Sequence, residues 1–245
     1  DIVIASSTYP LDIYPAYRIA RHYHAKLIYE VHDLWPLSPM ELGGYSKKHP
    51  FIRIMQKAED DCYRYADAVV SMLPKAEEHM REHGLTRDKF HYVPNGIVLS
   101  DWNNPKGIPE EHGLLLSKLR AEGKFIVGFA GAHGIANSLY AVIDAVSSLT
   151  EQNVVLVLVG GGQEKENLIK YAHKKGVTNV YFLLPINKLA IPNLLKEMDV
   201  LYIGLQKQSL FRFGISPNKM FDYMMAAKPI IQAIDAGNNL VREAD

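Results

Sequence analysis

The sequence is poor in cysteine, balanced in charge and free of long hydrophobic runs. Its single cysteine, Cys62, excludes an internal disulfide and is typical of a reducing compartment. Lys and Arg together number 27, as do Asp and Glu, so nothing in the net charge attracts nucleic acid. No apolar run approaches the roughly 20 residues that a membrane span needs. These absences and the 48% hydrophobic content indicate a soluble globular protein without a signal peptide, which we expect in the cytoplasm.

The apolar pattern alternates between short runs rich in Val and Ile and longer helical segments. Runs of this kind are typical of strands covered on both faces of a parallel sheet. Strands are predicted at Asp1–Ser6, Lys26–Val31, Ala68–Met72, Lys89–Val93, Phe125–Ala130, Val154–Val159, Val180–Leu184, Val200–Ile203 and Pro229–Ala233. Helices are predicted at Leu11–Tyr23, Phe51–Tyr65, Lys75–His83, Leu139–Leu149, Glu164–Lys175, Lys188–Glu197 and Pro217–Ala227. Repeated βα units predict a doubly wound α/β architecture.

A loop-rich stretch, residues 95–124, interrupts this pattern and predicts two domains, 1–102 and 103–245. The chain starts directly on a strand pattern and ends within a helical pattern that has no stop signal. We therefore expect an internal fragment in which both domains are incomplete. A ligand is expected in a cleft between the domains, at the carboxyl ends of their strands.

Two glycine turns follow predicted strands of the second domain. In "GFAGAHGIANSL", Gly131 and Gly134 allow close approach of a ligand to the backbone, and His133 lies within the turn. The second turn, "GGGQ", begins at Gly160 and has no acidic residue at the tip of its strand, which disfavours a dinucleotide fingerprint. A tight turn without a ligand explains either stretch almost as well.

Polar residues of the first domain offer two further hypotheses. His32 and Asp33 follow a strand, where the imidazole could share a proton and the carboxylate could orient it, or where both are merely structural. Glu59–Asp61 lie within a helix and are predicted to be a solvated face, because adjacent helical side chains diverge. No cluster with metal-ligand spacing is identified.

Basic and apolar residues mix in "GGYSKKHPFIRIMQK". Such a mixture favours an anionic membrane surface, although an ordinary amphipathic helix is the simpler reading. The residues concerned are the basic Lys47, Lys48, Arg53 and Lys57 and the apolar Phe51, Ile52, Ile54 and Met55.

The stretch "FGISPNKMFDYMMAAKPII" predicts an anion site at a helix start. Ser216 is a suitable N-cap and Pro217 a suitable first helical residue. Asn218, Lys219 and Asp222 share a face by spacing. The opposite, buried face is expected to consist of Phe221, Met224 and Met225. A lysine in the first turn opposes the helix dipole, and a bound diphosphate would remove that conflict.

Several stretches in order along the chain resemble the family 4 glycosyltransferases with the GT-B fold. They are "VPNGI", "LVGGGQE", "NVYFLLPI", "MDVLYIGL" and "KMFDYMMAAKPII". "DLWP", "GAHGIAN" and "FGISPNK" are similar to a branch of bacterial surface-polysaccharide enzymes that transfer N-acetylated amino-deoxysugars, such as N-acetylfucosamine, to lipid-linked acceptors. The resemblance implies two Rossmann-like domains and a retaining transfer from a nucleotide-diphosphate sugar, with no bound metal or other cofactor.

The resemblance also implies roles for particular residues. The expected catalytic residues are His32, Asp33, Lys219 and Asp222, and the acceptor is expected near His32 and Asp33. The expected donor-binding residues are Gly131, His133, Gly134, Asn137, Gly161, Pro185, Ile186, Ser216, Asn218 and Lys219. Many relatives carry two Glu residues with seven positions between them, where this chain has Gly214 and Asp222. Many also carry an Arg and a Lys in the loop where this chain has Ala132 and His133.

Three alternatives stay open at this point. One is a nucleotide-sugar 2-epimerase, which shares the scaffold. Another is a non-catalytic nucleotide-binding subunit, which the missing Glu favours. The third is a nicotinamide dehydrogenase. For the transferase, the expected partners are the sugar donor, a lipid-linked or glycan acceptor and the inner face of the plasma membrane.

Overall fold

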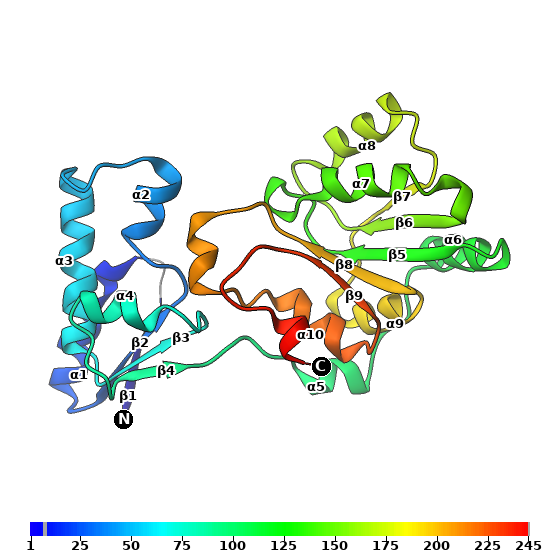
Figure 1. The fold of residues 1–245 in the computed structure, drawn as a ribbon. Coiled ribbons are helices and arrows are strands. Elements are labelled where there is room, and N and C mark those ends of the chain that lie inside the picture. The colour runs from blue at the N-terminus through cyan, green and yellow to red at the C-terminus, as the bar shows by residue number, and fades with distance from the viewer. Residues whose placement is uncertain (7–8, 245) are drawn as a thin grey trace. The chain divides into compact units, whose positions relative to one another are not determined.

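The structure, a computed structural model, describes residues 1–6 and 9–244 as two compact units, each built on a parallel sheet (Figure 1). The first unit comprises Asp1–Asn95, Gln208–Ser216 and Ala236–Asn239. The second unit comprises Gly96–Lys207, Pro217–Asp235 and the residues from Leu240 onward. The predicted fold class, two α/β domains with parallel sheets, is confirmed for the described residues.

This division differs from the predicted domains 1–102 and 103–245. The residues just after Asn95 belong to the second unit, because Trp102 packs against its core. The segment Gln208–Ser216 returns to the first unit, where Phe213 joins the core. Arg212 fixes it there through two hydrogen bonds, of 2.8 and 2.7 Å, to the carboxylate of Glu41. Such long-range pairs leave no local signal in the sequence.

The first unit contains a sheet with strand order β1-β2-β3-β4. Its strands are β1 (Ile2–Ser6), β2 (Lys26–Val31), β3 (Ala68–Ser71) and β4 (Phe90–Tyr92). Its helices are the 3-10 helix η1 (Pro10–Asp12), α1 (Ile13–His22), α2 (Leu37–Gly43), α3 (Pro50–Tyr65), α4 (Glu77–Glu82) and the 3-10 helix η5 (Ser209–Phe213).

The core of the first unit lies on one face of its sheet. Leu27, Tyr29 and Val31 alternate along β2 and pack into this core. On β1, Ile2 and Ile4 are 63% and 59% exposed, so the expectation of strands covered on both faces is wrong there. The exposed side chains lie on an edge strand of the sheet, where only one neighbouring strand is paired.

The second unit contains a sheet with strand order β7-β6-β5-β8-β9. Its strands are β5 (Phe125–Ala130), β6 (Val154–Val159), β7 (Val180–Leu183), β8 (Val200–Gly204) and β9 (Ile230–Ala233). Its helices are α5 (Leu99–Asn103), α6 (Glu110–Ala121), α7 (Leu139–Ser147), α8 (Lys165–Lys174), α9 (Ile191–Lys196), α10 (Asn218–Met225), α11 (Leu240–Glu243) and the 3-10 helices η2 (Ile135–Asn137), η3 (Thr150–Gln152) and η4 (Lys188–Ala190).

This second sheet is covered on both faces. Helices α7 and α8 pack on one face, and α6, α9 and α10 pack on the other (Figure 1). Alternate residues of β6 therefore enter different cores, with Val157 on one side and Leu156 and Leu158 on the other. The strand order reverses between β5 and β8, and the edge of a sheet at such a reversal is where open α/β folds bind ligands.

All nine predicted strands are found in the described residues, with ends that differ by at most one position. The short helices α2 and α5 were not predicted, because they lie in stretches rich in Pro, Gly and Asn. The described part of the chain holds no helix that is both apolar enough and long enough to cross a bilayer.

Candidate functional site

A cavity of about 370 Å³ lies in the second unit where β5, β6 and β7 end. Gly131 and Ala132 line it after β5, Val159, Gly160 and Gly161 at the end of β6, and Pro185 and Ile186 after β7, with Ile191 from α9 completing the lining. The structure thus brings together four predicted donor-binding residues, Gly131, Gly161, Pro185 and Ile186. Their side chains are small or apolar, so the cavity can recognise a ligand through backbone groups and a flat apolar wall.

The two glycine turns hold each other in place. The amide of Gly131 donates to Val159 O at 3.0 Å, and the amide of His133 donates to Gly161 O at 2.7 Å. A Cβ atom at Gly160 would overlap the carbonyl oxygen of Gly131, so glycine is required for this close approach. The loops form a rigid backbone wall at the edge of the sheet.

Helix α10 places Lys219 against this wall. The helix packs through Met220 and Tyr223, and the Tyr223 hydroxyl accepts the amide hydrogen of Ala130 at 3.0 Å. The fully buried residues are therefore Met220 and Tyr223. Of the predicted face, Met224 packs against the same core, whereas Met225 is exposed and Phe221 is not part of the core, so the prediction is wrong for these two. The side chain of Lys219 then extends toward Gly131, where a Cβ atom would lie 3.1 Å from its Cε.

Lys219 is largely buried and has no carboxylate partner among the described residues. Its Nζ donates to Asn137 Oδ1 at 2.6 Å and lies 4.7 Å from the ring centroid of Phe129. Burial lowers the pKa of the ammonium from 10.5 to about 8. The site therefore holds a cation near the cavity without the carboxylate that would stabilise its charge.

Asn137 links this lysine to the first glycine turn. Its amide nitrogen donates to Ala132 O at 2.9 Å while its oxygen accepts from Lys219. Gly134 lies just before η2 and has open space at its Cβ position. Its predicted contact with the donor could therefore be made only by backbone groups. Asn137 was predicted as a donor-binding residue, but its hydrogen bond to Lys219 spans 82 positions and was not foreseen.

His133 does not reach the cavity surface. Its side chain is fully buried between Phe129 and Phe182, with ring centroids 6.1 and 6.3 Å away. Neither ring nitrogen has a hydrogen-bond partner in the described residues. Burial, followed by the charge of Lys165, lowers the pKa of the imidazole to about 4. The imidazole is therefore neutral at pH 7 and supports the turn from beneath, and His133 does not line the cavity.

Asp222 and Asn218 line a second cavity, of about 380 Å³, with Trp102 and Lys188. Asp222 Oδ1 accepts a hydrogen bond from Trp102 Nε1 at 3.3 Å. Burial raises the pKa of Asp222, against the lowering effect of that hydrogen bond. Asp222 and Lys219 thus have different partners, Trp102 and Asn137, although both lie in the first two turns of α10.

The start of α10 also differs from the prediction. Pro217, not Ser216, is the N-cap residue, and no side-chain cap is formed. The Ser216 hydroxyl instead accepts the amide hydrogen of Asn95 at 2.9 Å within the first unit. Gly214, where relatives carry Glu, has φ +101°, and its Cβ atom would lie 2.5 Å from Pro74 Cδ. A glutamate cannot replace this glycine without moving the backbone.

His32 belongs to a polar cluster at the carboxyl ends of β1 and β2. The Ser6 hydroxyl donates to Glu30 Oε2 at 2.6 Å and lies 3.0 Å from His32 Nε2. The imidazole nitrogen lies 3.5 Å from the same Glu30 oxygen. Asp33 follows in an exposed position. Sequence reasoning missed Ser6 and Glu30, although both lie at strand ends.

The prediction of a solvated face at Glu59–Asp61 is wrong for Glu59 and Asp61, although Asp60 between them is partly exposed. Glu59 and Asp61 are 1% and 3% exposed. The Tyr63 hydroxyl donates to Glu59, whereas the Tyr14 hydroxyl and the Lys57 ammonium donate to Asp61. Glu59 also lies near His79 and His83, with one potential ligand atom from each residue within 4.8 Å of the others. In the sequence, the spacing H-x-x-x-H from His79 to His83 is the signal that marks this cluster.

Comparison with known proteins assigns both parts of the chain. A family model described as "Glycosyl transferase 4-like domain" matches residues 1–96. A protein of Bacillus subtilis (strain 168) named "Putative teichuronic acid biosynthesis glycosyltransferase TuaH" is 24% identical over 215 residues. That alignment covers 84% of this chain and 50% of the relative, so the chain spans about half the length of the curated relative that it matches.

Solved structures share the fold at low sequence identity. The Anabaena protein Alr3699/HepE, in complex with UDP and glucose, has a TM-score of 0.66 and 18% identity, over 96% of this chain and 60% of that one. WaaG, a glycosyltransferase involved in lipopolysaccharide biosynthesis, has a TM-score of 0.63 and 16% identity, over 93% of this chain and 64% of that one.

A second family model, described as "Glycosyl transferases group 1", matches residues 116–238. This region is half of the chain and carries Lys219 and both glycine turns. The resemblance found in the sequence is therefore confirmed, and this protein belongs to the family of glycosyl transferases group 1.

Proposed function

We propose that this protein transfers a sugar, with retention of configuration, from a nucleotide-diphosphate donor to a lipid-linked or glycan acceptor in surface polysaccharide synthesis. The observation that carries the proposal is the buried Lys219, placed against the glycine wall at the edge of the second sheet. A lysine with a lowered pKa and no carboxylate partner in the described residues is suited to a ligand that brings its own negative charge.

The diphosphate of the donor would lie against the amides of the Gly131 and Gly160 turns. Negative charge develops on this group as the bond to the sugar breaks, and a preorganised cation and amides stabilise it. Lys219 would supply that cation and Asn137 would keep it in place. We expect no metal to be needed here, because the protein provides the positive charge itself. Pro185 and Ile186 would contact the base.

The remaining residues fit supporting roles. Asn218 and Asp222 line a cavity next to the donor cavity, since Ile191 lines one and Pro192 of the same helix lines the other. They are suited to hydroxyl groups of the ribose or sugar. In the first unit, His32 would position the acceptor hydroxyl with Ser6 and Glu30, and Asp33 would contact the acceptor. The similarity of "GAHGIAN" and "FGISPNK" to one branch favours an N-acetylated amino-deoxysugar.

The family membership and two comparisons support this reading. HepE was solved with UDP and glucose, and TuaH is named for teichuronic acid biosynthesis. The 2-epimerase and the non-catalytic subunit are the competing functions. The first would isomerise the donor, and the second would bind it without turnover.

A turnover assay distinguishes these functions. The protein is incubated with UDP-N-acetylglucosamine or UDP-glucose and a lipid-linked acceptor extract, and products are followed by mass spectrometry and by the NMR coupling of the anomeric proton. We expect UDP release coupled to a glycosylated acceptor with the anomeric configuration of the donor. An isomerised donor would establish the epimerase instead, and tight UDP binding with no product from any donor tested would favour the non-catalytic subunit.

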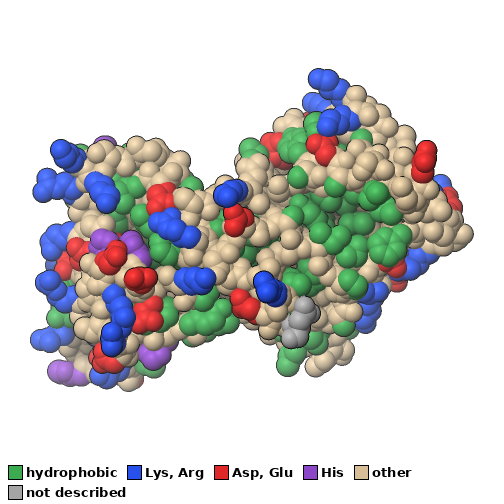
Figure 2. Space-filling view, viewed as in Figure 1, with side chains coloured by type: hydrophobic (Ala, Val, Ile, Leu, Met, Phe, Trp, Pro, Cys, Tyr) green, Lys and Arg blue, Asp and Glu red, His purple; other side chains and the backbone are tan. Residues whose placement is uncertain are grey.

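The membrane contact proposed for the first unit can be tested separately. Ile52 and Met55 are buried and therefore cannot contribute to a membrane surface, but Leu42, Tyr45 and Ile54 are exposed beside Lys47, Lys48 and Arg53. Figure 2 shows Lys and Arg side chains along the side of the first unit formed by α3, with acidic side chains between them. This mixture supports weak, charge-dependent binding to the cytoplasmic face of the membrane.

Replacing Lys47 and Lys48 with alanine is expected to weaken binding to phosphatidylglycerol vesicles about 30-fold. The estimate follows from roughly 1 kcal/mol for each basic side chain near an anionic surface. Sedimentation with vesicles measures it, and Lys118→Ala with Lys174→Ala, on helices of the second unit, is the matched control. Equal losses in the two double variants would show that Lys47 and Lys48 form no membrane site.

A further inference from the structure

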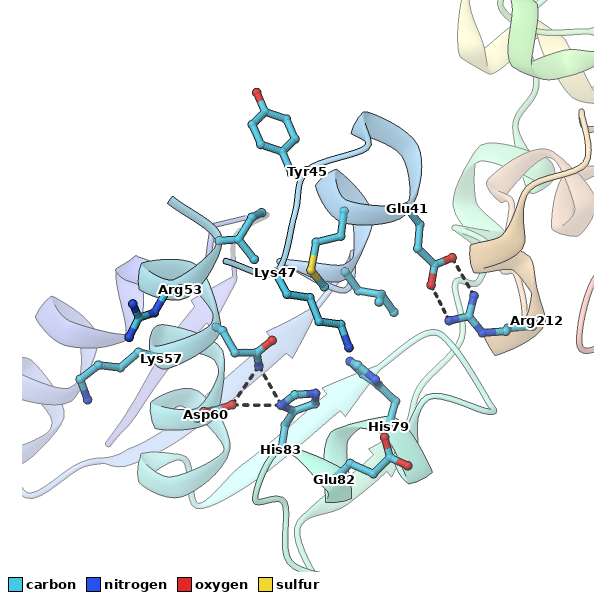
Figure 3. Close-up of a pocket in the computed structure, with 14 residues that line it drawn as sticks. Glu41, Tyr45, Lys47, Arg53, Lys57, Asp60, His79, Glu82, His83 and Arg212 are labelled. Carbon is cyan, nitrogen blue, oxygen red and sulfur yellow. Dashed lines mark hydrogen bonds and ion pairs between the residues drawn. The ribbon is translucent and has the colours of Figure 1, made fainter. Parts of the chain in front are cut away.

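Two helices of the first unit bring three metal-ligating side chains together. Glu59 lies on α3 and His79 lies on α4, and His83 is the C-cap residue of α4. One potential ligand atom from each residue lies within 4.8 Å of the others. The histidines are four positions apart and therefore share one face, with ring centroids 4.8 Å apart. Figure 3 shows both histidine rings at the same pocket.

The carboxylate of Glu59 is buried without a lysine or arginine partner in the described part of the chain. Its side chain is 1% exposed, and its oxygens accept from the Tyr63 hydroxyl at 2.9 Å and from Gln56 Nε2 at 2.7 Å. Both donors are neutral. A buried carboxylate needs a compensating positive charge, because removing it from water is costly. The one ion-pairing group beside it in residues 1–6 and 9–244 is His79.

The imidazole of His79 is poorly satisfied. Its Nε2 lies 3.6 Å from Glu59 Oε1, which is longer than a hydrogen bond. The atom is buried and has no hydrogen-bond partner in the described residues. The 3.6 Å between His79 Nε2 and Glu59 Oε1 is wide enough for a metal ion to bond to both atoms.

Hydrogen bonds around His83 are unbalanced as well. The Gln56 amide nitrogen lies 2.7 Å from Glu59 Oε2, 2.9 Å from Asp60 Oδ1 and 2.7 Å from His83 Nδ1. It carries two hydrogens for these three contacts. His83 Nδ1 also lies 3.1 Å from Asp60 Oδ1. A protonated Nδ1 can donate to Asp60 but faces the hydrogens of the Gln56 amide. An unprotonated Nδ1 can accept from that amide but faces the carboxylate oxygen of Asp60. The tautomer with the proton on Nδ1 pairs with Asp60 and leaves the lone pair of Nε2 available to a cation.

We propose that Glu59, His79 and His83 bind one Zn²⁺ ion. Two imidazoles and one carboxylate are a ligand set typical of zinc, and three protein ligands leave one position of a tetrahedron open. His79, His83 and Asp60 line a cavity of about 830 Å³, so an ion held by the histidines can be reached from it. Asp60 acts as a positioning residue by fixing the ring of His83. The ion links α3 to α4 and can take an anionic ligand from the cavity in its open position.

Zinc and cobalt titrations of the full chain test this site. By calorimetry against a chelator of known affinity, we expect one zinc ion per chain. His79→Ala and His83→Ala should each weaken binding more than about 100-fold, and Asp60→Asn about 10- to 100-fold. His91→Ala, an exposed histidine on β4, is the matched control and should bind as the unchanged protein does. Co²⁺ in place of zinc should give the visible absorption of a tetrahedral site.

The competing explanation is a buried ion pair between Glu59 and a protonated His79. The ion pair predicts that the unchanged protein binds no stoichiometric zinc and gives no visible cobalt bands. Either of these two results overturns the zinc proposal. Equal zinc affinity in His79→Ala, His83→Ala and His91→Ala also overturns it. The cobalt spectrum of the unchanged protein decides the matter even if an alanine variant fails to fold. A zinc-dependent rise in melting temperature, absent from His83→Gln, would support the site.

Discussion

Replacing Lys219 with methionine is expected to weaken UDP binding about 10- to 100-fold while making the fold more stable at pH 7. The loss of affinity follows from about 1.5–3 kcal/mol for hydrogen bonds to a charged group. Methionine removes the ammonium, and with it the contact to the Phe129 ring, but fills a similar volume with a flexible apolar side chain. Calorimetry with UDP and urea unfolding measure the two effects, and Lys118→Met, an exposed lysine on α6, is the control.

The gain in stability follows from the lowered pKa of Lys219. The ammonium is less stable in the folded protein, with a pKa of about 8, than in the unfolded chain, with a pKa near 10.5. Below pH 8 the lysine is protonated in both states, and its lowered pKa in the folded protein costs up to about 3 kcal/mol of folding stability. From pH 8 to 10.5 the unfolded chain holds the extra proton, so stability rises with pH and the advantage of the methionine variant disappears.

A purely structural lysine would give the opposite pattern. If Lys219→Met destabilised the protein at pH 7 and left UDP affinity unchanged, Lys219 would be part of the scaffold and not of a diphosphate site. Loss of both stability and affinity would assign the lysine to the fold, with the change in affinity following from the unfolding.

Replacing His133 with leucine is expected to remove most of the acid sensitivity of the fold. The imidazole has a pKa of about 4 when folded and near 6.5 when unfolded, so stability is complete above 6.5 and falls as the pH drops toward 4. Between pH 7 and 4.5 this loss amounts to about 2 kcal/mol. Leucine does not titrate and needs no hydrogen bonds in this apolar setting. At pH 7 the variant should be at least as stable, because two unpartnered nitrogens are removed.

Urea unfolding at pH 7, 5.5 and 4.5 measures this prediction. His173→Gln, on the surface of α8, should keep the acid sensitivity of the unchanged protein. An equally steep loss of stability in His133→Leu would show that other groups cause the acid sensitivity, and a strong loss at pH 7 would show that His133 has a partner in solution.

The sequence predicted the second unit well because parallel strands impose a common edge. The runs at Phe125–Ala130 and Val154–Val159 have the predicted bounds, and the glycines after them meet because the carboxyl ends of adjacent parallel strands lie together. Lys219 was predicted from a local conflict between its charge and a helix start. The hydrogen bond between Lys219 and Asn137 could not be predicted, because the two residues lie 82 positions apart in the sequence.

The errors share one cause, which is tertiary packing that overrides local rules. Ser216 has the chemistry of an N-cap, but its hydroxyl bonds to Asn95, 121 positions away. Met220 and Tyr223 face the sheet because Tyr223 bonds to β5, and this fixes the rotation of α10 about its axis. Glu59 and Asp61 look like solvated charges in a helix, but both are buried, where the Tyr63 hydroxyl donates to Glu59 and the Tyr14 hydroxyl donates to Asp61.

The most direct test of the diphosphate site is the number of protons taken up when UDP binds at pH 8. Free Lys219 is about half protonated there, and a diphosphate beside it would hold the ammonium fully charged. Since the phosphates of UDP, with a pKa near 6, are ionised at this pH, calorimetry in two buffers should report an uptake of about 0.5 proton per UDP. Lys219→Met should show none. Zero uptake by the unchanged protein, or equal uptake by both, would contradict the account.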